Sequence, residues 1–210
     1  MQTDVFESGR LFHGSESSFE QFEHQQSYQH GHNNGFGFYM TPDLNRAKTY
    51  AENGYIYEVD TSKVSDMRML DSEKVTLSND DLADFIDYVN QQQIEDDGYP
   101  YLLSDYGYDL DESEFEYTHE YSQQLADSML ENEYDESDVD IINDLNNALG
   151  DSELAGKALT KINIGYSLDH SLDQDNPDVV IFDPGNIKIT NKQLTQDLLK
   201  NMDITHEISR

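Results

Sequence analysis

Residues 35–41 read GFGFYMT and are the middle one of three short stretches that decide the fold. The other two are residues 11–15, which read LFHGS, and residues 178–183, which read DVVIFD. Each stretch is an apolar run that carries one polar or aromatic group, so each is predicted to be a strand displaying that group on an otherwise apolar surface. A histidine, a tyrosine and a carboxylate displayed in this way can hold and polarise a sugar.

The length and composition restrict the class of protein. A chain of 210 residues can form one sizeable core, or a core with a subdomain. The absence of cysteine excludes a disulfide framework, a thiolate metal site and a cysteine nucleophile, and it favours a reducing compartment. The first residues show no basic-then-apolar leader, and no apolar run approaches the roughly 20 residues of a membrane span. We therefore expect a cytoplasmic protein without a membrane partner.

The charge is distributed very unevenly. The net charge is −32, from 44 acidic and 12 basic residues, which repels nucleic acid and anionic lipid. Residues 71–155 hold 26 of the acids and only one base, Lys74, whereas residues 1–70 hold 10 acids and 5 bases and residues 156–210 hold 8 and 6. Adaptation to salt would spread the acids over the whole chain. We therefore predict an acidic module at 71–155 with its own basic partner, inserted between the two halves of a core, 1–70 and 156–210.

Helical spacing of apolar residues identifies the secondary structure of the acidic module. The first helix has apolar residues at positions 82, 85, 86 and 89, and the second at positions 139, 142, 145 and 149, ending at Gly150. A third helix is predicted around residues 112–132. The faces opposite these apolar stripes are acidic, which for any single residue indicates no more than a solvated helix face. For 26 acids against one base, that explanation is incomplete, because ordinary solvated helices mix both signs of charge.

The flanks are predicted to contain mainly strands. Thr41 is a suitable N-cap for a helix over 42–53 that ends at Gly54, and the alternation in residues 55–60 is typical of a strand. Strands are also predicted over 159–164 and 187–190, followed by a last helix over 191–202. The sequence thus predicts an α+β fold with an inserted helical subdomain.

The first two stretches resemble motifs of the ADP-ribosyltransferase superfamily. His13, Gly14 and Ser15 are similar to the H-G-S of its poly-ADP-ribose polymerase branch, in which the histidine binds ribose hydroxyls and the glycine backbone and the serine bind the nicotinamide amide. Residues 37–50 resemble the G-x-Y-[FL]-[AT]…A-x-x-Y segment, in which two tyrosines eleven residues apart enclose the nicotinamide ring. Tyr39 and Tyr50 have this separation, and Thr41 occupies the [AT] position.

The third stretch resembles the strand that carries the catalytic glutamate of the superfamily, and it places Asp178 at that position. Loss of nicotinamide leaves positive charge on the ribose, and a carboxylate beside it stabilises the transition state. Asp178 is one methylene shorter than glutamate. Asp183 is the competing candidate, but the following Pro-Gly indicates a turn there. The second acid of arginine-specific members would fall at Asn176, which makes arginine modification less favoured.

The resemblance implies a mono-ADP-ribosyltransferase of the H-Y-E/D type, with a split β-sheet core and NAD⁺ as its substrate. Catalysis would use Asp178, Tyr39 and His13, and NAD⁺ binding would use His13, Gly14, Ser15, Tyr39, Thr41 and Tyr50. The expected target is a basic protein, such as one that binds nucleic acid, and a phage or mobile-element effector fits this description. Two alternatives remain open: an inactive acidic mimic of nucleic acid, and an enzyme acting on a small molecule. No metal site is predicted, because the polar loop at 23–34, with its three histidines, is better explained as a cover over the NAD⁺ cleft.

Overall fold

Strands from both flanks of the chain combine into two sheets. The computed structural model describes residues 5–6, 10–24, 36–108, 117–131 and 137–197. Sheet A has the order β1-β3-β7, and sheet B has the order β2-β6-β5-β4. The strands are β1 (Leu11–Ser15), β2 (Phe38–Met40), β3 (Tyr55–Asp60), β4 (Arg68–Leu70), β5 (Ile164–Asp169), β6 (Asp178–Ile181) and β7 (Lys188–Leu194). Each sheet therefore depends on both ends of the chain, and the fold is mixed α/β.

The two faces of sheet B have different roles. Alternate residues of a strand point to opposite faces, so Phe38, Met40, Val179 and Ile181 share one face, which packs into a core with sheet A. The other face carries Val180, which belongs to a second core formed with the helices. The two sheets are tied together by a bridge in which the backbones of Phe12 and Thr41 exchange two hydrogen bonds of 2.8 Å.

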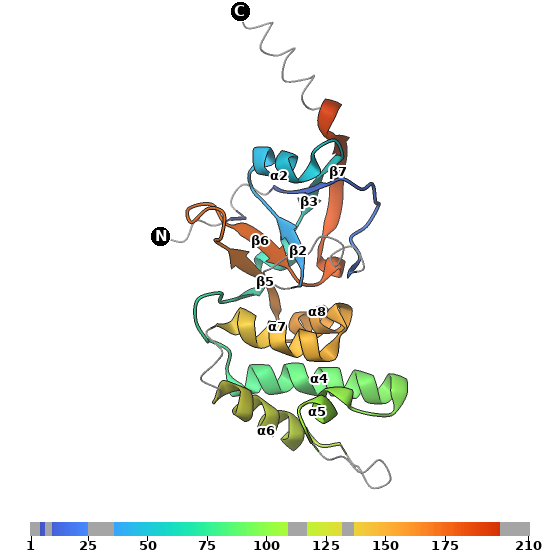
Figure 1. Ribbon diagram of the computed structural model, residues 1–210, viewed down its shortest axis with the longest axis vertical. Coiled ribbons are helices and arrows are strands. Elements are labelled where there is room, and N and C mark those ends of the chain that lie inside the picture. Colours follow the sequence, from blue (N-terminus) through green and yellow to red (C-terminus); the bar gives the residue numbers. More distant parts are fainter. Residues whose placement is uncertain (1–4, 7–9, 25–35, 109–116, 132–136, 198–210) are drawn as a thin grey trace, which may run out of the picture.

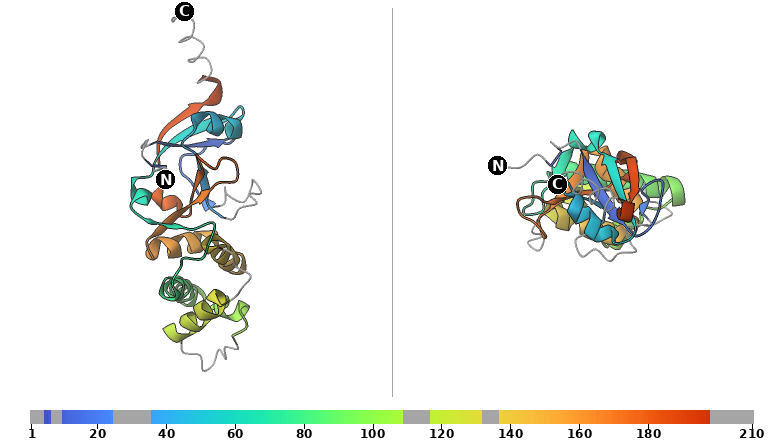
Figure 2. Two further views of the ribbon diagram at one scale, coloured as in Figure 1. Left: turned by 90° about the vertical axis from the view of Figure 1, so that its left-hand side faces the viewer. Right: turned by 90° about the horizontal axis from the view of Figure 1, so that it is seen from above.

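The helices stack in layers below the sheets (Figures 1 and 2). Helices α7 and α8 lie next to the strands, and α4, α5 and α6 lie farther away along the long axis of the molecule. Helix α2 is separate from this stack and packs against sheet A. The helices are α2 (Leu44–Ala51), α3 (Ser62–Ser65), α4 (Asn79–Asp97), α5 (Tyr101–Asp105), α6 (His119–Leu130), α7 (Asp138–Leu149) and α8 (Ser152–Lys161), with a 3₁₀ turn η2 (Pro184–Asn186).

Local sequence signals explain where the long helices begin and end. The Ser78 hydroxyl accepts from the backbone N–H of Asp81, and the Asp81 side chain accepts from the backbone N–H of Ser78, which forms a capping box at the start of α4. Ser137 caps α7 in a similar way, through the backbone N–H of Asp140. Gly150, with φ of 65°, ends α7 in the left-handed conformation, as predicted.

Most of the predicted elements are confirmed, with shifts in their boundaries. Helix α4 buries the four apolar positions that identified it, α7 buries positions 142 and 145 of its set, and β3 matches residues 55–60. The helix predicted around 112–132 is α6, and residues 112–116 and 132 lie outside the described part of the chain. The helix predicted over 42–53 begins after Asp43, whose carboxylate accepts from the N–H of Asn45; Thr41 is instead held in the bridge between the sheets.

Two predictions for the second flank were wrong in part. Residues 159–161 belong to α8 and not to a strand, because Ala155, Ala158 and Leu159 form a buried helical face. Residues 191–194 extend β7 along β3, so the predicted last helix begins later, with residues 195–197 helical; residues 198–202 lie outside the described chain. Among the residues that the structure describes, no helix combines the length and the apolar character needed to cross a membrane.

Candidate active site

Tyr39 and Asp178 lie on the same face of sheet B. Tyr39 of β2 is opposite Val180 of β6, and Asp178 is two residues away on β6, so their side chains are diagonal neighbours. Asp178 is only 3% exposed, and Tyr39 is half-buried. Burial raises the pKa of the Tyr39 phenol, and the nearby carboxylates of Asp169 and Asp178 raise it further. The phenol is therefore protonated at neutral pH and can act as a donor or as an apolar ring.

Helix α2 brings Tyr50 to the same carboxylate. The Tyr50 hydroxyl lies 3.4 Å from Oδ2 of Asp178, and the ring is 44% exposed. Burial is the main cause that raises the pKa of Tyr50, and the charge of Asp178 adds to it. A distance of 3.4 Å is long for an O–H···O bond, so this contact is weak and can be replaced by a substrate hydroxyl. Three of the residues predicted from sequence, Tyr39, Tyr50 and Asp178, are thus brought together.

Arg46 is a member of the site that the sequence did not reveal. Its Nη1 donates to Oδ1 of Asp178 at 2.8 Å and to the Asn176 carbonyl at 2.9 Å, and its Nη2 donates to Asp173 at 2.9 Å. The side chains of Arg46 and Asp178 are 14% and 4% exposed. Arg46 precedes Tyr50 by one helical turn, so both can point toward β6. The spacing of Arg46 and Tyr50 was a signal that the two side chains share one face of the helix. The partner of Arg46 could not be inferred, because Asp178 lies 132 residues away in the sequence.

His13 joins the two sheets and does not reach Asp178 through any contact that the structure describes. Its Nδ1 lies 2.8 Å from the backbone carbonyl of Tyr39. A carbonyl can only accept, so this nitrogen carries the proton. The ring packs edge-on against Phe22 with centroids 5.1 Å apart, and Phe19 and Tyr57 lie slightly farther away. His13 therefore fixes the position of Tyr39 through its backbone.

The three remaining residues of the predicted NAD⁺ site have local structural roles. A side chain on Gly14 would overlap the backbone carbonyl of Ala47, so this glycine allows α2 to approach β1 closely. The Ser15 hydroxyl accepts from the N–H of Ser17 at 3.1 Å. The Thr41 hydroxyl accepts from the N–H of Asp43 at 3.2 Å, and its side chain is buried. These roles position β1, β2 and α2 around the tyrosines.

Asp183, the competing acid, occupies a different environment. Its Oδ1 accepts from the N–H of Gly185 at 2.8 Å, and its Oδ2 accepts from the Thr160 hydroxyl at 3.2 Å. These bonds stabilise the turn that follows β6. Asp183 therefore contacts Thr160 of α8, whereas Asp178 contacts Arg46 and Tyr50 of α2.

The loop predicted to cover the cleft falls largely outside the described residues. Residues 25–35, which include His30 and His32, belong to the part that is not described. His24 is buried and packs against Phe38, with ring centroids 5.2 Å apart. Burial lowers the pKa of the His24 imidazole, against the opposite effect of the Glu153 charge. His24 is therefore a neutral core residue at pH 7.

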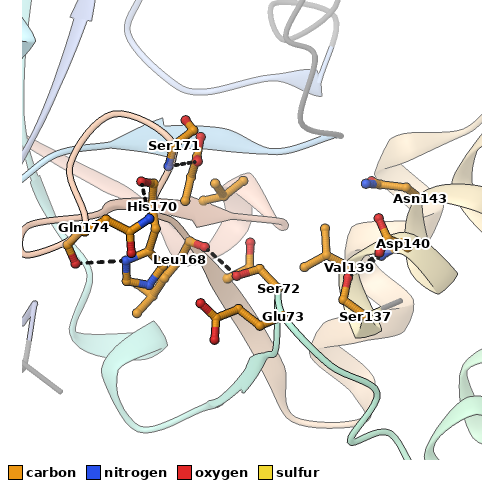
Figure 3. A pocket seen from close by; sticks show the side chains of 13 residues that line it. Ser72, Glu73, Ser137, Val139, Asp140, Asn143, Leu168, His170, Ser171 and Gln174 are labelled. Atoms are coloured by element: carbon orange, nitrogen blue, oxygen red, sulfur yellow. Dashed lines mark hydrogen bonds between the residues drawn. The ribbon is translucent and has the colours of Figure 1, made fainter. Parts of the chain in front are cut away.

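A pocket of about 370 Å³ opens on the same face of sheet B, beside this group of residues (Figure 3). Its floor contains Ser167, Asp169 and Val180. Asp169 is the cross-strand partner of Asp178, so the pocket borders the site directly. The start of α7 and the segment after β4 form the facing wall.

No protein-family model, curated protein or solved structure matches this chain. The resemblance to the ADP-ribosyltransferases therefore depends on the three motifs and on the arrangement of their residues.

Proposed function

We propose that this protein is a mono-ADP-ribosyltransferase that cleaves NAD⁺ and transfers ADP-ribose to a protein. The observation that carries the proposal is the meeting of Tyr39, Tyr50 and Asp178 on one side of sheet B, from three separate segments of the chain. The two-sheet architecture, in which each sheet contains strands of both flanks, agrees with a split transferase core.

The chemistry follows from the groups at the site. The tyrosine rings offer flat surfaces for the nicotinamide ring, each contact contributing about 0.5–1.5 kcal/mol beyond buried area. When the bond from the ribose C1′ to the pyridine nitrogen breaks, the electron pair leaves with nicotinamide and positive charge develops on the ribose. The Asp178 carboxylate stabilises that charge. An acceptor lone pair then forms the new bond to C1′, and the acceptor loses a proton.

Arg46 gives the Asp178 carboxylate a fixed orientation. It holds Oδ1 with a short bond, and among the described residues Oδ2 has only the long contact to Tyr50. A ribose hydroxyl can therefore bind Oδ2 without breaking the ion pair. Arg46 also neutralises part of the carboxylate charge, and this favours the second candidate function, an inactive acidic mimic of nucleic acid.

The acidic helices support a basic protein as the target. Exposed acids lie on α4, α6 and α7, for example Asp84, Glu120 and Asp144, and Lys74 is the only base of residues 71–155. Such a surface attracts the basic face of a protein that binds nucleic acid. In this proposal, α4, α6 and α7 select the target and the sheets carry out the chemistry.

Release of nicotinamide from NAD⁺ by the purified protein tests the proposal. We expect release by the wild type and a loss of at least a hundredfold in Asp178→Asn, with Asp183→Asn as the matched control that retains activity. Absence of release from the wild type, with binding to basic proteins retained, would support the mimic. Equal activity of wild type and Asp178→Asn would exclude Asp178 as the catalytic acid.

A further inference from the structure

The pocket beside Asp169 has acidic walls that come from separate parts of the chain. Asp169 lies at the end of β5, Asp140 lies in the first turn of α7, and Glu73 follows β4. Among the described residues that line the pocket there is no lysine or arginine. The walls therefore favour a positively charged ligand and repel the pyrophosphate of NAD⁺.

The Ser167 hydroxyl is an independent sign of a ligand. Ser167 lines the pocket and is 4% exposed. No hydrogen bond joins its hydroxyl to another described residue. A hydroxyl in the lining of a pocket with no hydrogen bond to another described residue is available to a ligand.

The arrangement fits an organic cation better than a metal ion. Within the described part of the chain, no three or more His, Cys, Asp or Glu residues converge closely enough to bind a metal. The carboxylates instead border a space of about 370 Å³, which is a volume suited to a small organic group. Figure 3 shows Asp140 and Asn143 of α7 across the open space from His170 and Leu168.

We propose that this pocket binds the guanidinium group of an arginine side chain on a protein partner. A guanidinium group presents five N–H donors in a plane, so it can bind carboxylates on different walls and the Ser167 hydroxyl together. It is also more weakly hydrated than an ammonium group, which favours its transfer into a half-enclosed pocket. A protein source agrees with the surrounding acidic surface, which attracts basic proteins. The binding needs neither NAD⁺ nor catalysis, so it goes beyond the proposed function.

The test is an NMR titration of the full chain with N-acetyl-L-arginine amide, in the absence of NAD⁺. We expect saturable shifts of the Ser167, Asp169 and Asn143 amide signals. The neutral isostere N-acetyl-L-citrulline amide should cause no such shifts. Equal shifts with both compounds, or none with the arginine compound, would overturn the proposal. Tighter binding of spermidine would also overturn it in favour of a free polyamine, and the same shifts with Ca²⁺ would overturn it in favour of an inorganic ion.

Matched variants separate the binding role from a structural one. Asp140→Asn should weaken binding of the arginine compound by about two- to fivefold, the effect expected for one exposed ion pair. Asp144→Asn, one turn later on the same helix and outside the pocket lining, should leave binding unchanged. Ser167→Ala should weaken binding severalfold without lowering stability, because it removes a hydroxyl that makes no hydrogen bond to another described residue. Unchanged binding in both Asp140→Asn and Ser167→Ala would contradict the assignment.

Discussion

Replacing Asp178 is expected to reduce stability as well as activity. From sequence, the position at a strand end predicts that truncation leaves the fold intact, but the carboxylate is buried against Arg46. Removal of one partner from a buried ion pair typically costs about 3–5 kcal/mol. In Asp178→Ala, Arg46 keeps its bonds to Asp173 and to the Asn176 carbonyl. We therefore expect a smaller loss, about 2–3 kcal/mol of unfolding free energy.

The conservative change should cost less. In Asp178→Asn, the side-chain oxygen can still accept from Arg46, so only the charge is lost, and we expect about 1–2 kcal/mol. Urea unfolding followed by circular dichroism would give both values. A double-mutant cycle with Arg46→Met should give a coupling energy of at least about 1 kcal/mol, because the two side chains are in direct contact.

Asp173, the exposed member of the ion pairs around Arg46, provides the control. Asp173 is 39% exposed in its side chain, so Asp173→Ala should cost under about 1 kcal/mol. If Asp178→Ala changed the unfolding free energy by no more than Asp173→Ala does, the reasoning that Asp178 is a buried partner of Arg46 would be refuted. Asp178→Asn is consequently the better variant for activity measurements.

Three further predictions concern single side chains. Asp138 is 1% exposed and accepts four hydrogen bonds, two from Thr76 and one each from Leu77 and Asp71. Asp138→Ala should therefore lower the unfolding free energy, measured by urea titration, by about 3 kcal/mol. A loss below about 1 kcal/mol would contradict this prediction. The Arg68 guanidinium and the Ser78 cap hold the pKa of the Asp81 carboxyl at about 2. Because this pKa is depressed, Asp81 contributes stability above its ordinary pKa of about 4, and the contribution disappears as the pH falls toward about 2. The loss of unfolding free energy in Asp81→Asn, about 1 kcal/mol at pH 6, should therefore shrink on acidification. A loss that does not change with pH would disprove this prediction. Tyr39→Ala should weaken binding of an unreactive NAD⁺ analogue, measured by calorimetry, by up to about tenfold, whereas Tyr39→Phe should leave it unchanged. Equal affinities of the wild type and both variants would show that the Tyr39 ring is not part of the site.

The sequence predicted best the elements whose signals are local. The apolar spacing in residues 82–89 and the capping serine at position 78 identify α4 without reference to the rest of the chain. The period of two in residues 55–60 identified β3 in the same way. Residues 159–164 show the opposite case, because a short run of apolar and polar residues fits either period. The deciding signal was earlier, at Asp151, whose carboxylate accepts from the N–H groups of Glu153 and Leu154 and starts α8.

The candidate site was predictable only where motifs mark it. Tyr39, Tyr50 and Asp178 were selected by a resemblance, and the structure brings them together. Arg46 was missed because its partner is distant in the sequence, and one arginine on a helix has many possible partners. The acidic pocket was missed for the same reason, because its floor and its facing wall are assembled by the pairing of β5 with β6 and by the packing of α7.

The acidic helices and sheet B share one hydrophobic core. Leu70 of β4 and Val180 of β6 are buried in the same cluster as Phe85 of α4 and Leu145 of α7. Removing residues 71–155 would therefore expose the helix side of sheet B, which carries Tyr39 and Asp178 on its strands. The role of the acidic surface is better isolated by neutralising exposed acids, because such changes leave the core and the tyrosines in place. The acidic side chains lie on the outer faces of helices, and the inner faces of the same helices support the site. The helices therefore link the selection of a basic partner to the chemistry proposed for the sheet.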